Sequence, residues 1–399
     1  MRTIKKKVLD KNKSRSKQSK RLGIVKSKQS NKKRLVKKCK GTKRPFRWLL
    51  IYYTIYSHEY ADFVKRVLPY IESTKKKCRN VAFDLISISR TYGGSRSIDP
   101  STTNGYSVIS YSPGQKQFKV AMDPCEDITA CIQKMLNAQF NRSKGRGYDG
   151  IMYSGHSNGI AMGYDRDQVL ENIDLASILR KEVKRTHRKL EVVAFDSCYQ
   201  GTLATIFDFR KVTKYIMASP SYHDHRSVIE ADTFFQKPAG MSVIDWLKSI
   251  TDSYVQKADR LHHIDYPIMN NIFSGPAIGR LGNYITKSRL YDTLKFTKGT
   301  QIFHDDPNLH DLERALDKSE RRKDVPTAVK AKIRRAKILF RKSVVHAPHN
   351  PKNKLATVFP KLAVHSYLPD YVDSEVVCRM KYFGKTKACK VKKSKKSKE

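Results

Sequence analysis

The middle of the chain alternates short apolar runs with amphipathic segments. Residues 47–55, RWLLIYYTI, are apolar and aromatic, which is typical of a buried strand. Similar runs predict strands at 80–89, 148–154, 190–196 and 214–219, and another near 268–278. Apolar residues at helical spacing predict helices at 58–74, 123–140, 170–186, 203–209 and 243–258. The turn at 112–114 joins segments 106–111 and 117–122 into a predicted hairpin.

Alternating strands and helices predict an α/β domain, with a mostly parallel sheet covered by helices on both faces. The pattern weakens after about residue 286, where residues 312–343 are strongly basic and have the apolar spacing of an amphipathic helix. Such a helix suits packing on the domain, nucleic acid or an anionic surface equally well. We therefore divide the chain into a basic arm at 1–46, a domain at 47–285, a basic, largely helical extension at 286–378 and a basic tail at 379–399.

Positive charge is concentrated at the two ends of the chain. Residues 1–47 hold 21 Lys or Arg and one acid, and residues 379–399 hold 10 Lys or Arg and one acid, so these ends carry +29 of the net charge of +43. Such runs cannot bury apolar surface, and we expect both ends to be disordered. Lys-rich tails bind polyanions such as nucleic acid by releasing counterions, or are read as nuclear-import signals. The alternative is a solubilising tail with no dedicated partner.

Neither a secretory signal nor a membrane segment is visible in the sequence. The basic N-terminal segment has no apolar core after it. The longest apolar run, at 48–55, is far shorter than the roughly 20 residues of a membrane helix. The seven cysteines include no C-x-x-C pair, and their spacing suits neither zinc nor a disulfide framework. We expect an intracellular protein of the nucleus or the cytoplasm, with no membrane partner.

Two polar turns follow predicted strands. GHSNG (155–159) follows the strand at 148–154, and SCYQG (197–201) follows the strand at 190–196. Parallel sheets place their active sites beyond the carboxyl ends of the strands. A cysteine that attacks a carbonyl needs a neighbouring base and donors for the oxyanion. The 42 residues from His156 to Cys198 leave room for one helical crossover between adjacent strands, so His156 is the candidate base and Cys198 the candidate nucleophile.

The segments YSGHSNG (153–159) and VAFDSCYQG (193–201) resemble the caspase-like cysteine peptidases, a group that includes clostripain-like peptidases, metacaspases, legumains and gingipains. Those families place a catalytic histidine after one sheet strand and a catalytic cysteine after the next. The resemblance covers roughly residues 46–280. It implies a caspase-like three-layer α/β/α sandwich with a mostly parallel central sheet, and a cysteine peptidase with His156 and Cys198 as its catalytic pair.

The resemblance also implies roles in substrate binding and oxyanion stabilisation. In clostripain-like enzymes and metacaspases, the acid two before the cysteine, here Asp196, faces the pocket for the residue before the cleaved bond and selects Arg or Lys. The structural alternative is an aspartate that caps the following turn. Ser219 is similar to the serine-bearing strand end that lines the substrate cleft in clostripain-like enzymes. The N–H groups of Ser157 and Cys198 are the expected oxyanion donors. The family usually has glycine in place of Ser157, and an altered turn is also typical of an inactive relative.

Other chemistry-bearing side chains form weaker patterns. Several histidines lack a matching second ligand set for a metal, and we interpret them as surface or loop residues: His187, His223, His225, His262 and His263. We predict no metal site and no cofactor. Several relatives require calcium, and calcium binding stays an open alternative for one group of acidic residues. This group lacks the glycine and the spacing of a dedicated calcium loop: Asp165, Asp167, Glu171 and Asp174.

We therefore predict a cysteine endopeptidase that cleaves polypeptides after Arg or Lys. His156 would act as general base and then as acid toward the leaving amine, with Cys198 as the nucleophile. The alternative is a catalytically inactive caspase-like binding module, or a basic, nucleic-acid-associated structural protein such as one packaged in the virion of a large DNA virus. The intact His/Cys pair favours the enzyme, and Ser157 favours the alternative.

Overall fold

The computed structural model describes a core of the chain. The described residues are 44–54, 67, 69–70, 80–90, 106–111, 118–121, 128–143, 147–157, 159, 161–165, 168–221, 223, 228–231, 233–259, 269–297, 299, 301–302, 309–348 and 361–365. Most of both basic ends, and all but three residues of the helix predicted at 58–74, lie outside them. Polyanion binding by the tails therefore stays a prediction. In the part that the structure describes, no helix is both long and apolar enough to cross a membrane.

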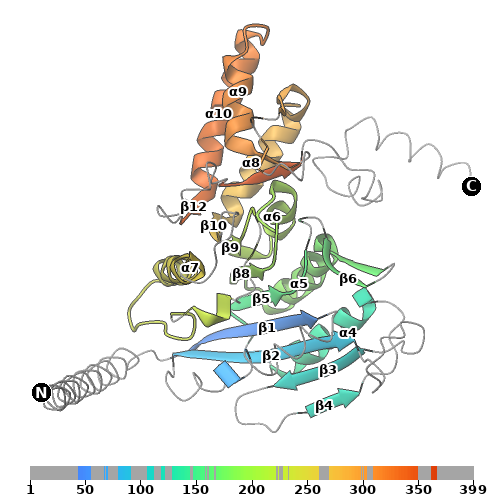
Figure 1. The fold of residues 1–399 in the computed structure, drawn as a ribbon. Coiled ribbons are helices and arrows are strands. Elements are labelled where there is room, and N and C mark those ends of the chain that lie inside the picture. The colour runs from blue at the N-terminus through green and yellow to red at the C-terminus, as the bar shows by residue number, and fades with distance from the viewer. Residues whose placement is uncertain are drawn as a thin grey trace, which may run out of the picture.

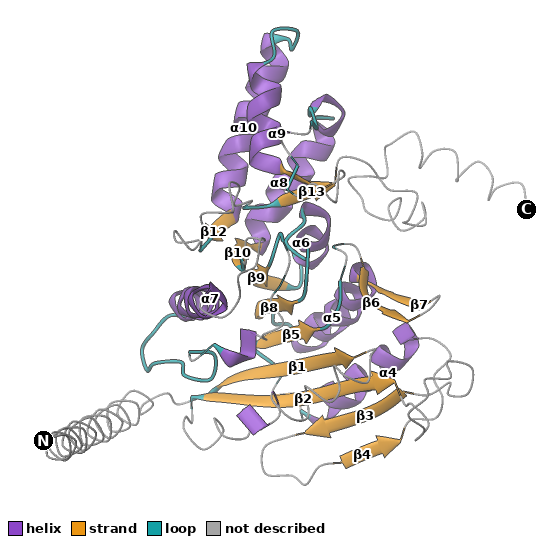
Figure 2. Cartoon of the chain, in the orientation of Figure 1, coloured by secondary structure: helices purple, strands orange, loops and turns teal. Residues whose placement is uncertain are grey.

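Nine of the described strands form one sheet with helices on both faces (Figures 1 and 2). In chain order they are β1 (Phe46–Thr54), β2 (Val81–Arg90), β3 (Tyr106–Tyr111), β4 (Phe118–Ala121), β5 (Gly150–Ser154), β8 (Leu190–Asp196), β9 (Thr213–Ala218), β10 (Asn271–Ser274) and β12 (Val344–His346). Two small sheets pair β6 (Ala161–Asp165) with β7 (Gln168–Glu171), and β11 (Leu309–Asp311) with β13 (Ala363–His365). The helices are α4 (Ile128–Arg142), α5 (Asn172–Thr186), α6 (Leu203–Phe209), α7 (Val243–Asp259), α8 (Gly275–Lys287), α9 (Leu312–Arg321) and α10 (Thr327–Ser343).

The centre of the main sheet is parallel. Its strand order is β12-β10-β9-β8-β5-β1-β2-β3-β4, and the five strands from β9 to β2 are all parallel to their neighbours. The pairs at both edges are antiparallel, including the predicted hairpin of β3 and β4. The predicted α/β/α class with a mostly parallel central sheet is therefore confirmed.

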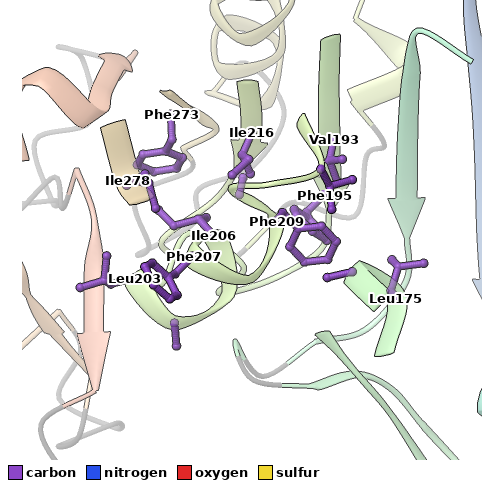
Figure 3. Close-up of a cluster of buried hydrophobic side chains, with 14 of the residues drawn as sticks. Leu175, Val193, Phe195, Leu203, Ile206, Phe207, Phe209, Ile216, Phe273 and Ile278 are labelled. Carbon is purple, nitrogen blue, oxygen red and sulfur yellow. The ribbon is translucent and has the colours of Figure 1, made fainter. Parts of the chain in front are cut away.

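Alternating side chains of the central strands feed two separate cores. In β1, Leu49 and Ile51 join the core that includes residues of α4, α5, α6 and α8. Trp48 and Leu50 join the core on the other face, which includes Trp246 of α7. Figure 3 shows part of the first core, where Phe207 and Phe209 of the short helix α6 lie among side chains from neighbouring strands and helices. Both faces of the strands whose ends carry the candidate site are therefore buried.

The C-terminal extension is built into the same core. The single helix expected at 312–343 is two helices, because the chain turns at 322–326 and α10 begins directly after Pro326. Ile333, Ala336 and Phe340 of α10 join the first core, and β12 extends the main sheet. Packing on the domain is thus the role that the structure shows for the apolar side of this segment. The expected boundary at residues 285–286 falls inside α8.

Phe340→Ala is expected to lower the free energy of unfolding of the full chain by about 3–5 kcal/mol, because it empties a buried aromatic site. Phe340 is 1% exposed. The matched control is Ile338→Ala on the same helix, which is expected to stay within about 0.5 kcal/mol because Ile338 is 43% exposed. Denaturant unfolding followed by intrinsic fluorescence measures both. An independent extension would show a separate transition that shifts alone, and that result would contradict the shared core.

Candidate active site

The two predicted turns lie at the same edge of the sheet. Strands β5 and β8 are parallel neighbours, and their register sets Ser154 opposite Asp196. His156 and Cys198 each come two residues after this pair. The expectation that the two strands are adjacent and parallel is confirmed, and it brings His156 and Cys198 to equivalent positions beyond the carboxyl ends of the strands. The His156 side chain is exposed there, and Cys198 is half-buried.

The histidine turn packs directly on the cysteine turn. The carbonyl oxygen of Gly159 accepts a hydrogen bond from the Thr202 hydroxyl at 3.0 Å. Gly159 has φ +86°, and a Cβ atom here would lie 2.8 Å from the carbonyl oxygen of Tyr199. Glycine is therefore required at this position by both the backbone conformation and the close approach.

Ser157 stands where the caspase-like peptidases that the sequence resembles usually have glycine, and its hydroxyl group makes structural hydrogen bonds here. The residue is buried, and Ser157 Oγ accepts hydrogen bonds from Gln200 Nε2 and from the N–H of Gly159. Gln200 belongs to the cysteine turn and is fully buried. The serine side chain therefore ties the histidine turn to the cysteine turn.

The cysteine turn is also fastened to the segment that follows β9. The N–H of Tyr199 donates to the carbonyl oxygen of Ser221 at 2.8 Å, and the N–H of Gly201 donates to that of Ser219 at 2.6 Å. Ser219 is fully buried, and its hydroxyl donates to the Ser221 carbonyl oxygen at 3.1 Å. Tyr199 has φ +57°, which is costly for a bulky residue and is typical of functional turns. This arrangement places the backbone of Ser219 against Gly201 of the cysteine turn.

The surroundings of the Cys198 thiol favour its neutral, protonated form over the thiolate. Burial raises the pKa of Cys198 above its ordinary value, and the nearby Asp196 carboxylate raises it further. A hydrogen bond from the backbone N–H of His223 to Cys198 Sγ, at 3.3 Å, acts in the opposite direction. Because burial is the largest of these effects, a base is needed to form the thiolate.

Asp196 is buried and bridges three elements. Asp196 Oδ2 accepts a hydrogen bond from Ser154 Oγ at 2.9 Å, and Oδ1 accepts one from the backbone N–H of Val228 at 2.8 Å. Nε2 of His223 lies 3.4 Å from Oδ1. The carboxylate therefore anchors backbone beyond β9, a structural role related to the turn-capping alternative, and it lies close to the candidate nucleophile.

His223 was predicted to be a surface or loop residue, and the prediction that it lies at the surface is wrong. Only 3% of its side chain is exposed. Its ring stacks on that of Tyr254 from α7, with centroids 4.8 Å apart and planes 20° apart. The sequence carries no sign of this contact, because β9 and α7 bring the two residues together only in the folded chain.

Solved structures with a similar fold exist, although neither a family model nor a curated protein sequence matches the chain. A secreted C11 cysteine protease from Bacteroides thetaiotaomicron, "iotapain", aligns with a TM-score of 0.61 at 12% identity, over 87% of this chain and 100% of that chain. An inactive zymogen C11 protease from Parabacteroides distasonis aligns with a TM-score of 0.56 at 13% identity, over 86% of this chain and 99% of that chain. The fold is clostripain-like. At sequence identities of 12% and 13%, the comparison shows the shared fold alone.

Metal ligation has no candidate cluster among the described residues: no group of three or more His, Cys, Asp or Glu side chains there could hold an ion. Asp167, His225, His262 and His263 lie outside those residues. Calcium binding by the acidic residues at 165–174 therefore stays an open alternative.

The site residues that sequence reasoning missed are Ser154, Val228 and Tyr254. Ser154 could have been found, because its separation from Asp196 equals that of His156 from Cys198.

Proposed function

We propose that the chain is a cysteine endopeptidase that cleaves polypeptides after Arg or Lys. The observation that carries the proposal is the parallel pairing of β5 with β8, which gives His156 and Cys198 equivalent places beyond the Ser154–Asp196 pair. The clostripain-like fold and the contacts between the two turns support it. On this basis His156 is the general base and Cys198 the nucleophile.

The reaction follows from the state of the thiol. Because burial keeps Cys198 protonated at rest, His156 takes the thiol proton as the sulfur attacks the scissile carbonyl. The N–H groups of Ser157 and Cys198 donate to the oxygen that gains negative charge. His156 then gives its proton to the leaving amine. A water molecule hydrolyses the remaining thioester, again with His156 as base, and restores the free thiol.

Asp196 is the proposed selector of a basic side chain before the cleaved bond. Its side chain is 2% exposed and lies next to the cysteine turn. A carboxylate in such surroundings binds a substrate ammonium or guanidinium group through charge-assisted hydrogen bonds. The contacts of Asp196 with Ser154 and Val228 orient the carboxylate for this role.

A catalytically inactive binding module is the second candidate. The observation that favours it is that Cys198 and Asp196 both have hydrogen-bonding partners within the chain in this arrangement. The two candidates differ in one chemical property, since only the enzyme needs a thiol that reacts with an electrophile docked in a basic-side-chain pocket.

Labelling by a peptide acyloxymethyl ketone that ends in Arg tests the proposal. The full chain is expected to gain one adduct at Cys198 in intact mass spectrometry and to cleave an Arg-containing peptide. The same reagent ending in Asp is the control and is expected to label at least about 100-fold more slowly, since its carboxylate would face Asp196. If the chain is neither labelled nor active, with or without calcium, the inactive module is correct. Preferential labelling by the Asp reagent would leave the nucleophile in place and refute the specificity.

A further inference from the structure

His223 lies between the candidate nucleophile and the candidate pocket carboxylate, although it follows Cys198 by 25 residues. Its backbone N–H donates to Cys198 Sγ at 3.3 Å, and its ring nitrogen Nε2 lies 3.4 Å from Asp196 Oδ1. The other ring nitrogen, Nδ1, lies 3.0 Å from the hydroxyl oxygen of Tyr254, whose ring stacks on the imidazole. The imidazole is therefore held by contacts on several sides.

These contacts resemble those that a bound cation would make. A buried carboxylate is stabilised by a cation or by hydrogen-bond donors. Asp196 receives two neutral donors, from Ser154 and Val228, and His223 stands beside it as a group that can carry positive charge. An aromatic face such as that of Tyr254 also attracts a planar cation.

We propose that His223 competes with the substrate for Asp196: its imidazole occupies the place on Asp196 that a basic substrate side chain takes, so the substrate must displace it. This rests on the proposed function in one respect, that Asp196 is the pocket carboxylate. His223 therefore lowers the affinity for Arg or Lys and keeps the carboxylate covered until such a side chain arrives.

The exchange involves the ring of His223 and not its backbone. The segment that carries His223 is fastened to the cysteine turn by the bonds from Tyr199 to Ser221 and from Gly201 to Ser219. The backbone N–H of His223 itself points at Cys198 Sγ. Rotation about the side-chain bonds of His223 can release Asp196 while these backbone contacts stay in place.

Among the described residues, the groups that face His223 include Asp196 from β8, Cys198 from the turn after β8, and Tyr254 from α7. Asp196 is the one of these that a substrate cation would bind, so its contact with His223 is the one that the substrate replaces. A neutral substrate side chain forms no ion pair with Asp196 and does not make this exchange.

Peptide binding to full-length Cys198→Ala tests the proposal without turnover. The probe is a fluorescent peptide with a single Arg, compared by anisotropy at one pH with the same peptide carrying neutral citrulline. Adding His223→Asn is expected to make the Arg peptide bind about tenfold more tightly, the order of effect of removing one competing hydrogen bond to a charged group. The affinity for the citrulline peptide is expected to stay unchanged. His223→Gln is the second variant, should the first fail to fold.

The control is His187→Asn in the same Cys198→Ala chain. His187 is exposed at the end of α5 with φ 50°, a conformation that Asn adopts readily, so this substitution is expected to leave both affinities unchanged. The proposal is overturned if a folded His223 variant binds the Arg peptide no more tightly than its parent, or if the citrulline peptide gains as much affinity as the Arg peptide. Failure of the proposed function is distinct, because the chain with Cys198 intact would then resist the electrophile while the binding result stands.

Discussion

Replacing Cys198 by alanine is expected to lower kcat/KM for an Arg-containing peptide by at least about 10⁴-fold, because the nucleophile is lost and only binding remains. The clostripain-like fold should be unaffected, since Cys198 is half-buried in a turn held by backbone hydrogen bonds. Cys131→Ala on α4 is the matched control, and it is expected to retain wild-type activity. Initial rates with a fluorogenic peptide measure both variants.

His156→Ala is expected to cause a loss of similar order, because residues that act as a unit are not additive. The raised pKa of Cys198 gives a second readout with a definite sign. A thiol with a raised pKa is neutral at pH 7, so alkylation of wild-type Cys198 by iodoacetamide should keep accelerating above about pH 8.5, the ordinary thiol pKa. A plateau below pH 7 would show a preformed thiolate and contradict the role of His156 as general base.

The elements that carry the site were predictable because their local and tertiary preferences agree. The strand predicted at 190–196 and the helix predicted at 203–209 coincide with β8 and α6. Strand β8 is central and buried on both faces, so its residues 192–195, VVAF, form a continuous apolar run. Helix α6 begins at an N-cap, since the Thr202 hydroxyl accepts a hydrogen bond from the N–H of Thr205.

The strand prediction extended wrongly into the first turn of α8, residues 275–278, where tertiary packing overrides local preference. The strand predicted near 268–278 ends at Ser274, and the helix begins at Gly275. Glycines disfavour a helix interior, but here they allow close packing. A Cβ atom at Gly275 would lie 2.6 Å from the carbonyl oxygen of Thr213, and one at Gly282 would overlap the Phe207 ring. A single sequence does not reveal these neighbours.

The residues of the site also divide into those that the sequence reveals and those that it does not. His156 and Cys198 stand out because each follows an apolar strand and lies in a turn that contains glycine. The contacts of Asp196 with His223 and Val228 do not stand out, because they depend on how the chain returns after β9. Side chains set by strand register are therefore predictable, and those brought in by loops are not.

Asp196→Asn is expected to lower kcat/KM for Arg or Lys peptides by about 100-fold or more, because the substrate cation then enters a buried site without a countercharge. Asparagine keeps an oxygen acceptor of nearly the same shape, so the contact with Ser154 or with the Val228 N–H can persist. Stability should therefore change little. The comparison with wild type uses peptide cleavage and denaturant unfolding on the same samples.

Asp196→Ala separates selection from anchoring, the two roles that its position suggests. It removes the charge as asparagine does, but it also leaves the Ser154 hydroxyl and the Val228 N–H without their acceptor. Each buried donor left unpaired costs about 1–3 kcal/mol. Alanine should therefore combine the activity loss of asparagine with a clear loss of stability, while Cys198 still reacts with a small alkylating agent. If Asp196→Asn cleaves Arg peptides at the wild-type rate and only Asp196→Ala is impaired, the carboxylate is an anchor alone, and the selectivity for basic residues lies elsewhere or does not exist.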